Sequence, residues 1–295
     1  MTTATPTDLA FVIQLARDSG ALALGYYNAW HHGSASASAA ASAASAGALA
    51  VELKDGDEPV TLADRAVSDL CMRRLRAAYP ADAILSEEVP DDGSRHHAAR
   101  TWLIDPIDGT KDFIAGRPGF AVMIGLLEAG RPTLGVVYQP TVDCLWYARA
   151  GAGAAVMHGG RAAQVLQVSA VSELSACRLV SSASHPDPLV AELRARAGIR
   201  DEQNIGSVGI KLGLVAAGER DLYVNPASKC KLWDTVAPNI ILSEAGGRLS
   251  DLLGEPLVYD SQDLGHRRGL VASNGRLHTQ ALAQLAPLVA ALHRP

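Results

Sequence analysis

The feature that most constrains this chain is an apolar stretch that ends in two acids. Residues 102–113 read WLIDPIDGTKDF, so Asp105 and Asp108 stand three residues apart around Pro106, directly after an apolar run. A turn needs only one aspartate to cap its backbone, and the proline already supplies the bend. Two carboxylates held this close repel each other unless a positive group lies between them. The stretch therefore predicts a strand that ends at a cation-binding turn.

The residues within and after this turn complete a candidate site for a metal and a phosphate. Hard divalent cations are held by carboxylates, backbone carbonyls and water, so the Ile107 carbonyl is a natural further ligand. At Gly109 the backbone can approach a ligand closely, and exposed N–H groups bind phosphate oxygens. The Thr110 hydroxyl beside a metal can orient a bound water or take its proton. A plain helix start is the alternative, and from this segment alone both interpretations stay open.

Other acids have ordinary structural explanations when each is read singly. Glu87 and Glu88 close the segment AILSEE, where an acidic pair usually faces solvent. Asp64 follows Thr61 in the pattern of a capping box, and Asp234 lies near a helix start, where it would be an N-cap. Only their combination with residues 105–110 makes them candidate site residues.

Composition narrows the classes of function. The chain has 295 residues, 48% of them hydrophobic and 19% charged, which suits one large globular domain or two smaller ones. A net charge of -5 argues against a surface that coats nucleic acid. A small anionic substrate stays compatible if a bound metal reverses the local field. The four cysteines form no CxxC pair, so neither a disulfide framework nor a zinc site is expected.

The start of the chain has no basic n-region followed by an apolar run, and we read no signal peptide there. No apolar run reaches the roughly 18 residues that a membrane span needs. We therefore expect a cytoplasmic protein whose partner is a small molecule, with no nucleic acid and no membrane.

Periodicity predicts an α+β organisation in the first part of the chain. Apolar residues at helical spacing predict a helix over residues 8–30, capped by Asp8, and a second helix over residues 61–79. Between them, residues 33–50 form a Ser/Ala/Gly tract with little to bury, which predicts a mobile loop. Turn signals separate several short predicted strands, as in an antiparallel meander. These strands cover residues 83–87, 101–105, 120–127, 133–140 and 144–150.

The second part of the chain has a different order of predicted secondary-structure elements. Strands and helices alternate there, in the segments 178–184, 188–198, 208–218, 221–225 and 232–247. This change predicts a boundary near residues 170–178. We divide the chain into an N-terminal α+β half with the metal site, residues 1–174, and a C-terminal α/β half that contributes to substrate binding, residues 175–295.

Five segments carry a family resemblance when they are taken in order. They are VELKDGDEPVTLAD, ILSEE, WLIDPIDGTKDF, GVVYQP and WDTVAPNIILSEAGG. Together they resemble the inositol monophosphatase-like family of metal-dependent, lithium-sensitive phosphatases. The resemblance implies a layered α/β (α+β) sugar-phosphatase fold. An antiparallel sheet with helices would form the N-terminal half, a smaller mixed α/β sheet the C-terminal half, and the site would lie between them.

The resemblance also implies roles for individual residues. It implies two or three Mg²⁺ ions, held by Glu87, Asp105, the Ile107 carbonyl, Asp108 and Asp234. Asp64 matches an acid near the metal-bound water and Thr110 matches its hydroxyl partner, so Glu87, Asp64 and Thr110 form the implied catalytic set. Lys54 falls in a loop that folds over the site in this family.

Details of the sequence are similar to one subgroup, the 3′(2′),5′-bisphosphate nucleotidases, which hydrolyse 3′-phosphoadenosine 5′-phosphate to AMP. Inositol monophosphatases usually carry Asn where this chain has Asp112, and a carboxylate near the position of Asn225. The segments SSASH, GSVGIK and NPASKCKLWDT also resemble the subgroup. The implied substrate-binding residues are Asp108, Gly109, Thr110, His185, Gly209, Lys211 and Asp234.

The sequence thus predicts a Mg²⁺-dependent phosphomonoesterase of sulfur metabolism that acts on 3′-phosphoadenosine 5′-phosphate. An inositol-1-phosphate or fructose-1,6-bisphosphate phosphatase of the same family is the alternative. A non-catalytic protein that binds a phosphate ligand is the alternative from another class. Lys211 is the candidate cation for the second phosphate, and a solvated helix lysine is the alternative for it. A homodimer and a monomer both stay open.

Overall fold

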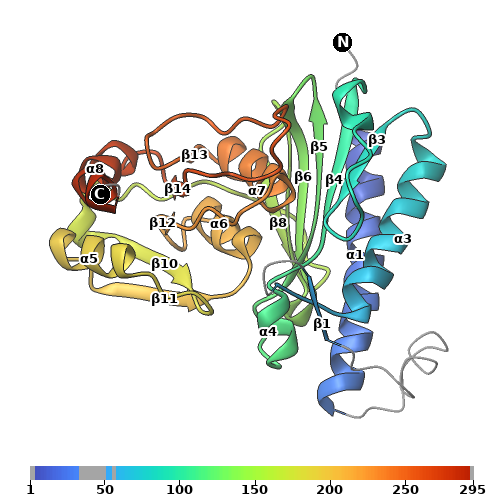
Figure 1. The fold of residues 1–295 in the computed structure, drawn as a ribbon, viewed down its shortest axis with the longest axis horizontal. Coiled ribbons are helices and arrows are strands. Elements are labelled where there is room, and N and C mark those ends of the chain that lie inside the picture. The colour runs from blue at the N-terminus through green and yellow to red at the C-terminus, as the bar shows by residue number, and fades with distance from the viewer. Residues whose placement is uncertain (1–3, 33–50, 55–57, 293–295) are drawn as a thin grey trace.

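The computed structural model describes residues 4–32, 51–54 and 58–292 of the 295-residue chain. Within these residues, helices and sheets alternate in five layers, in the order helix, sheet, helix, sheet, helix (Figure 1). A larger sheet is formed by the first part of the chain and a smaller, mixed sheet by the second. The layered α/β fold expected from the sequence is confirmed.

The larger sheet has seven strands in the order β3-β4-β5-β6-β7-β8-β9. It is antiparallel except for the pair β3 and β4, which run parallel. Its strands are β3 (Ala83–Ser86), β4 (Arg100–Asp108), β5 (Ala121–Glu128), β6 (Arg131–Gln139), β7 (Cys144–Arg149), β8 (Ala154–His158) and β9 (Gln164–Val165).

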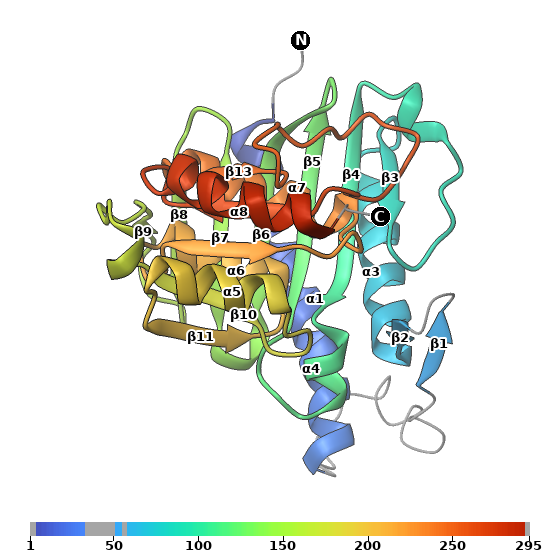
Figure 2. The ribbon, with the colours of Figure 1, turned by 60° about the vertical axis from the view of Figure 1, so that its left-hand side comes forward.

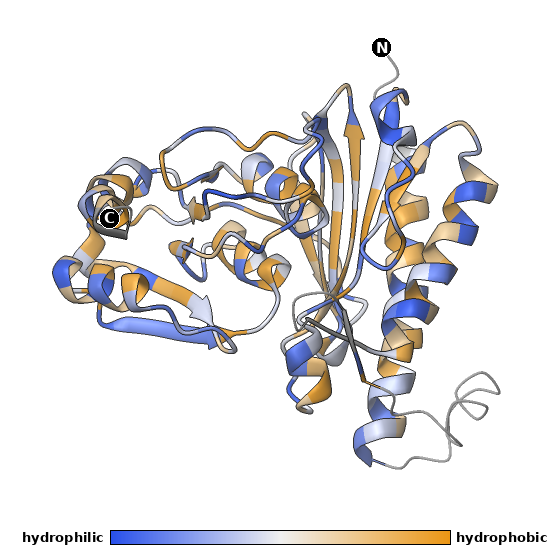
Figure 3. Ribbon diagram, viewed as in Figure 1, coloured by the Kyte–Doolittle hydropathy of each residue, from blue (hydrophilic) through white to orange (hydrophobic). Residues whose placement is uncertain are grey.

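Helices cover both faces of the larger sheet. The long helices α1 (Pro6–His32) and α3 (Leu62–Ala78) lie on one face, where Leu15 and Leu75 are buried in one cluster with Trp102. On the other face lie α6 (Val208–Ala216) and α7 (Leu232–Glu244), and Leu212 of α6 is buried with Trp146 of β7. Apolar residues therefore run along the central strands without strict alternation, as Figure 3 shows in orange.

The smaller sheet has five strands in the order β11-β10-β12-β14-β13. Strands β10, β11 and β12 run parallel, and β14 is antiparallel to both β12 and β13. Helices α6 and α7 fill the space between the two sheets, and α5 and α8 lie on the side away from the larger sheet (Figure 2). The elements are β10 (Arg178–Ser182), α5 (Pro188–Ala197), β11 (Asp201–Ile205), β12 (Leu222–Asn225), β13 (Arg248–Ser250), β14 (Leu270–Ser273) and α8 (His278–Leu292).

Two short elements lie near the end of β4. A hairpin of β1 (Glu52–Lys54) and β2 (Glu58–Val60) precedes α3, and the one-turn helix α4 (Thr110–Ile114) follows β4 directly. Strands of the larger sheet end at Val165 and those of the smaller sheet begin at Arg178. The proposed division at residues 174 and 175 falls between the two sheets.

The observed start of α1 differs from the predicted start of the first helix. Helix α1 begins at Pro6, and the Asp8 N–H donates to Thr5 Oγ1 at 3.1 Å while the Thr5 N–H donates to Asp8 Oδ2 at 2.7 Å. The predicted Asp8 cap is therefore wrong, because Asp8 lies inside the first turn. Its carboxylate closes a reciprocal pair of hydrogen bonds with the residue before the helix.

Several elements were not predicted from the sequence, among them β8, β9, β11, β13, β14 and α8. Strand β11 reads DEQNI and lies at the edge of its sheet, so it lacks the apolar signal of a strand; Figure 3 draws it largely blue. The predicted mobile loop at residues 33–50 lies outside the described residues. In the part of the chain that is described, no helix is both long and apolar enough to span a membrane.

Two paired glycines allow α7 to approach the larger sheet closely. Gly125 of β5 and Gly135 of β6 are direct partners in the antiparallel pair. A Cβ atom at Gly135 would lie 2.3 Å from the Ala237 carbonyl oxygen, and one at Gly125 would lie 2.9 Å from the Ala237 backbone nitrogen. At this point α7 packs against the backbone of the sheet, and this contact sets the distance between helix and sheet.

We expect Gly135→Ala to destabilise the protein by about 1–3 kcal/mol, because the added methyl group would overlap the backbone of α7. The free energy of unfolding in urea checks this. Gly25→Ala on α1 is the matched control, since nothing lies within 4 Å of its Cβ position. Alanine favours helix, so this control should be unchanged or more stable by up to about 1 kcal/mol. Equal stability of the two variants would contradict the close packing of α7.

Candidate active site

An irregularity in β4 brings the two aspartates of the sequence motif to one cavity. Asp105 pairs with Met123 of β5, and Asp108 pairs with Ala121. Two residues of β4 thus oppose the single residue Val122. In a regular strand, residues three apart point to opposite faces, and the additional residue of a bulge returns them to the same face. Both aspartates consequently line the same cavity.

Asp105 has the least favourable surroundings of these acids. Its exposed fraction is 2%, and its Oδ1 atom is buried with no hydrogen-bond partner among the described residues. Burial raises the pKa of this carboxyl well above its ordinary value, and the carboxylates of Glu87, Asp108, Asp234 and Asp64 raise it further. A buried, unpartnered carboxylate oxygen among other acids is the arrangement that a cation would stabilise.

Asp108 is held by the start of α6. Its Oδ2 atom accepts a hydrogen bond from Ser207 Oγ at 2.6 Å and another from the Gly209 N–H at 2.8 Å. Burial still raises the pKa of Asp108, while these two bonds and Lys211 act in the opposite direction. A Cβ atom at Gly209 would lie 2.3 Å from Met123 Sδ, so this approach of α6 requires a glycine. The Gly209 N–H points to Asp108, and Gly209 does not line the cavity.

Asp234 and Glu87 join the acids from two other elements. Asp234 lies in the first turn of α7 and accepts a hydrogen bond from the Lys231 N–H at 2.7 Å. Lys231 is the N-cap residue, so the N-cap interpretation of Asp234 is wrong. Burial, then Asp108 and Glu87, raise the pKa of Asp234 well above its ordinary value. Glu87 follows β3; its N–H donates to the Ile104 carbonyl at 3.1 Å, and it lines the cavity.

Asp64 and Thr110 are brought together from α3 and α4. Thr61 is the N-cap of α3 and Asp64 completes the predicted capping box, since its Oδ2 accepts hydrogen bonds from the N–H and the hydroxyl of Thr61 at 2.8 and 2.5 Å. Its Oδ1 accepts a bond from Thr110 Oγ1 at 3.4 Å, and the same hydroxyl lies 3.0 Å from the Ile107 carbonyl oxygen. Asp64 is therefore both a member of the capping box and a direct neighbour of the predicted catalytic hydroxyl.

Gly109 makes the turn after β4. Its φ is +98°, a left-handed conformation that favours glycine, and a Cβ atom there would lie 2.5 Å from the Gly119 carbonyl oxygen. Gly109 is also the N-cap of α4, which has five residues. The plain helix start, which was one of the two interpretations of this segment, is present, and the binding of a phosphate at Gly109 and Thr110 stays a prediction.

The cavity has a volume of about 320 Å³ and is lined from both parts of the chain. We call its four carboxylates the acidic group; they belong to Glu87, Asp105, Asp108 and Asp234. We call the three more accessible lysines and one histidine of the lining the basic group; they are Lys111, His185, Lys229 and Lys231. The remaining polar lining residues are Thr110, Ser182, Ser184, Ser207, Lys211 and Asn225. One cavity thus offers ligands for a cation and positive charge for an anion.

Lys211 and His185 occupy different positions in this lining. Lys211 has an exposed fraction of 3%, and its Nζ donates to the carbonyl oxygens of Ile205, at 3.3 Å, and Gly206. The solvated-lysine alternative is therefore wrong. Burial lowers the pKa of Lys211 to about 8, with Asp108 acting in the opposite direction. His185 is exposed, and its Nε2 lies 2.7 Å from Lys111 Nζ.

Sequence reasoning missed several lining residues. Lys111 follows Thr110 in the motif, and Ser207 caps α6, so an adjacency signal and a helix-start signal were available for these two. Trp233 precedes Asp234 and carried the same adjacency signal, whereas Tyr223 and Lys229 had no such signal. Their place in the lining depends on how β12 and α7 approach β4, which sequence spacing does not reveal.

The donors present fit a hard divalent cation. They are carboxylate oxygens and one backbone carbonyl, which are the ligands that Mg²⁺ takes in proteins. The unpartnered Oδ1 of Asp105 is an atom that such an ion would satisfy. In the described part of the chain, no three His, Cys, Asp or Glu side chains already surround one point as a bound ion requires. We therefore propose these carboxylates and the backbone carbonyl as ligands of a divalent cation.

Comparison with known proteins identifies relatives of the chain. Residues 10–290 match the inositol monophosphatase family. A histidinol-phosphatase of Mycobacterium tuberculosis is 36% identical over 248 residues, 80% of this chain and 88% of that protein. A 3′(2′),5′-bisphosphate nucleotidase CysQ of Salmonella typhimurium is 37% identical over 213 residues, 71% of this chain and 83% of that protein. A solved IMPase of Thermotoga maritima, 27% identical, gives a TM-score of 0.78 over 96% of this chain and 98% of its own.

We expect Asp105→Asn to raise the melting temperature of the protein in EDTA. The pKa of the Asp105 carboxyl is higher in the folded protein than in the unfolded chain. This carboxyl therefore lowers the stability of the folded protein at every pH above its unfolded pKa, which includes neutral pH. Asparagine removes the charge at nearly the same volume. Mg²⁺ should then raise the melting temperature of the wild type and have little effect on the variant. Differential scanning calorimetry with EDTA and with Mg²⁺ measures both effects.

Asp221→Asn is the control for this prediction. Asp221 is also fully buried, but its pKa is lowered, against the effect of burial, by hydrogen bonds from Arg178 and Ser169. The control should therefore lose stability in EDTA and keep its response to Mg²⁺. A wild-type response to Mg²⁺ in Asp105→Asn would refute the proposed ligand.

Proposed function

The chain belongs to the inositol monophosphatase family and is a phosphatase of that family, and from this premise we propose that it hydrolyses 3′-phosphoadenosine 5′-phosphate to AMP and phosphate with Mg²⁺. The observation that carries the choice of substrate is the charge of the cavity lining. Outside the acidic group, the described lining residues include the four members of the basic group and no carboxylate.

Positive side chains beyond the reacting phosphate favour a substrate with a second anionic group. A second phosphate can form charge-assisted hydrogen bonds with the lysines and a hydrogen bond with a histidine ring N–H. Histidinol phosphate carries an ammonium group instead, which calls for a carboxylate at that place. Inositol 1-phosphate carries only hydroxyl groups beyond its phosphate. Of these three esters, the bisphosphate nucleotide matches the basic group best.

Asn225 supports the same choice against inositol phosphates. Its Oδ1 accepts a hydrogen bond from the Ala227 N–H at 3.0 Å, and its Nδ2 donates to Cys230 Sγ at 3.0 Å. The amide is thus engaged by its own segment. It offers no negative charge to sugar hydroxyls, as a carboxylate at this position would.

For the metal, we propose two or three Mg²⁺ ions held by Glu87, Asp105, the Ile107 carbonyl, Asp108 and Asp234. When bound, such ions neutralise phosphoryl oxygens, lower the pKa of a bound water and stabilise the leaving oxygen. The bulge in β4 and the unpartnered Oδ1 of Asp105 support this ligand set. Hydrolysis would need no covalent intermediate with the protein.

The protein's own residues would orient the attacking water and accept its proton. Thr110 Oγ1, at 3.4 Å from Asp64 Oδ1, can accept a proton from the water while it passes its own proton to this oxygen. The two bonds from Thr61 to Asp64 Oδ2 fix the orientation of the carboxylate. Glu87, which lines the same cavity, would hold the water in line with the phosphorus atom.

The substrate would be held from both parts of the chain. We propose that Gly109 and Thr110 contact the reacting phosphate and that Asp108 and Asp234 lie beside it as metal ligands. Lys211 and His185 are proposed for the rest of the nucleotide, since both line the cavity. Gly209 enters this proposal only through its hydrogen bond to Asp108.

Histidinol phosphate is the second candidate substrate, because the Mycobacterium tuberculosis histidinol-phosphatase is 36% identical over 80% of this chain. Inositol 1-phosphate and fructose 1,6-bisphosphate stay alternatives within the family, and a non-catalytic phosphate-binding protein is the alternative outside it. The proposal also includes a cytoplasmic, lithium-sensitive enzyme of sulfur metabolism, either a monomer or a homodimer, on the strength of the family resemblance.

We expect 3′-phosphoadenosine 5′-phosphate to give a higher kcat/KM with Mg²⁺ than histidinol phosphate and inositol 1-phosphate, by about tenfold or more, since a hydrogen bond to a charged group contributes about 1.5–3 kcal/mol. Fructose 1,6-bisphosphate also carries a second phosphate, so charge alone does not decide its comparison with the nucleotide, which is a direct measurement. Phosphate release measures this, and EDTA or Asp105→Asn should abolish it in folded protein. A preference for histidinol phosphate or another ester would replace the proposed substrate. Binding of the esters without phosphate release would support the non-catalytic alternative.

We expect Lys229→Gln to raise KM for the bisphosphate on the order of tenfold, because one charged contact to the second phosphate is lost. KM for inositol 1-phosphate should stay within about twofold, since that ester has no second phosphate. Arg73→Gln is the control, because Arg73 is exposed on α3 and does not line the cavity. Equal changes of KM for both esters would contradict a contact between Lys229 and the second phosphate.

A further inference from the structure

Asp112 is a buried carboxylate that adjoins the candidate site without lining it. It lies on α4, and its exposed fraction is 2%. Thr110 and Lys111, the residues just before it, line the cavity, whereas Asp112 does not. A buried carboxylate must be paired and hydrogen-bonded, so its partners show which parts of the chain it connects.

The first oxygen of Asp112 connects α4 to the second part of the chain. Oδ1 accepts hydrogen bonds from Arg117 Nε at 2.8 Å and from Arg117 Nη2 at 2.5 Å. It also accepts a bond from Ser184 Oγ at 3.3 Å, and Arg117 Nη2 lies 3.4 Å from the same hydroxyl. Ser184 follows β10, so this three-residue contact joins the two parts of the chain.

The second oxygen of Asp112 lies in a notch between two glycines. Cβ atoms built at Gly119 and Gly206 would lie 2.1 and 2.4 Å from Oδ2. Gly206 comes directly before Ser207, whose hydroxyl donates to Asp108. The carboxylate of Asp112 therefore packs against the backbone that presents Ser207 to the acidic group.

The segment that Asp112 contacts is part of the cavity lining. Ser182, Ser184 and His185 all line the cavity, and the His185 N–H donates to Ser182 Oγ at 3.1 Å. His185 Nε2 lies 2.7 Å from Lys111 Nζ, which is a second contact between this segment and α4. Among the described contacts, these two thus join residues 182–185 to α4, and the one at Asp112 is the less exposed of the two.

We propose that Asp112 is a positioning residue that holds residues 182–185 against α4 and thereby shapes the part of the cavity that receives the non-reacting portion of the substrate. The proposal rests on the proposed function for the identity of that substrate. Asp112 does not line the cavity that contains the acidic group. Its loss should therefore change KM for a nucleotide more than kcat.

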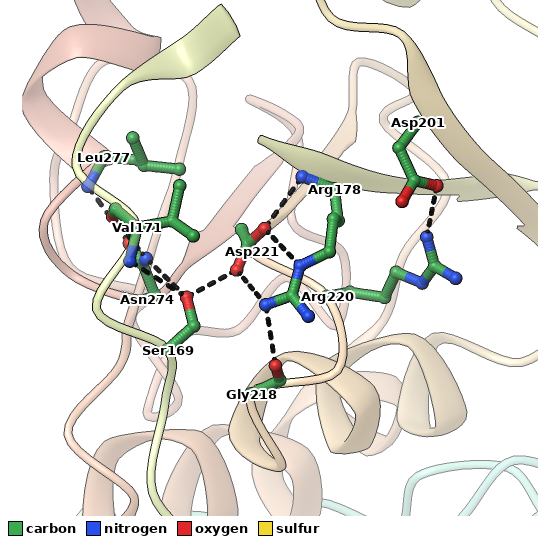
Figure 4. Close-up of polar contacts among 9 residues, drawn as sticks. All are labelled: Ser169, Val171, Arg178, Asp201, Gly218, Arg220, Asp221, Asn274 and Leu277. Atoms are coloured by element: carbon green, nitrogen blue, oxygen red, sulfur yellow. Dashed lines mark hydrogen bonds and ion pairs between the residues drawn. The ribbon is translucent and has the colours of Figure 1, made fainter. Parts of the chain in front are cut away.

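The chain contains a matched control for this carboxylate. Asp221 is fully buried and is likewise bonded to one arginine and one serine: its Oδ1 accepts bonds from Ser169 Oγ at 2.5 Å and Arg178 Nη2 at 2.7 Å (Figure 4). None of these three residues lines the cavity. A variant of this cluster reports what the loss of a buried Asp–Arg–Ser contact does to the fold without a direct effect on the site.

Hydrogen exchange of the full-length protein tests the positioning role without any substrate. In Asp112→Asn, we expect amides in residues 182–187 to exchange about tenfold faster than in the wild type, because roughly 1.4 kcal/mol of local stability corresponds to tenfold. Arg117→Gln should have the same effect, because it removes two of the donors to Asp112 Oδ1, and the melting temperature of both variants checks that they are folded. Asp221→Asn and Arg178→Gln should leave this segment unchanged. Unchanged exchange of residues 182–187 in both test variants would overturn the proposal.

Kinetics tests the consequence for substrate binding. With 3′-phosphoadenosine 5′-phosphate, Asp112→Asn should raise KM on the order of tenfold and change kcat by less than about twofold. KM for p-nitrophenyl phosphate, which has no nucleotide portion, should change by less than about twofold. Equal changes of KM for both esters would overturn the proposal.

The proposed function and the proposed role of Asp112 can be refuted independently of each other. If the wild type does not hydrolyse the bisphosphate, the proposed function is refuted. The exchange measurement still decides the role of Asp112, and the preferred ester of the wild type then replaces the bisphosphate in the comparison of KM values.

Discussion

The mutual repulsion of buried carboxylates at the end of β4 is the constraint on which the rest of the structure depends. The pKa values of Asp105, Asp108 and Asp234 are all raised, and burial is the largest cause for each. Acids on a flexible segment would move apart and into water. Here they are attached to a central strand and to a helix packed between two sheets, so the fold opposes that movement. A cation bound among these carboxylates would reduce the repulsion.

Both parts of the chain are needed to assemble this group. Asp105 and Asp108 end a strand of the larger sheet, while Asp234 and the donors to Asp108 come from α7 and α6. These two helices follow the smaller sheet's first strands in sequence but pack against the larger sheet. The site is therefore completed only when the later part of the chain has docked onto the earlier part.

The sequence was sufficient for elements whose pattern leaves few alternatives. Apolar runs bounded by turns predicted the central strands of the larger sheet, and the acids of the motif pointed to one cavity. Strand β11 could not be predicted, because an edge strand that reads DEQNI needs no apolar face. Spacing alone also could not show that a bulge turns Asp105 and Asp108 to the same side, or that Lys211 is buried. Side-chain direction depends on tertiary contacts that a linear pattern does not record.

The glycine pair in β5 and β6 has a consequence for the precision of the site. Because α7 rests on backbone atoms at Gly125 and Gly135, its height above the sheet does not depend on which rotamers the core side chains adopt. Asp234 is carried by the first turn of that helix. Rotamer exchange in the core on the nanosecond timescale should therefore move the backbone that carries this carboxylate little relative to β4, so the separation of the two charges depends on this backbone packing and on the rotamers of the two aspartates themselves.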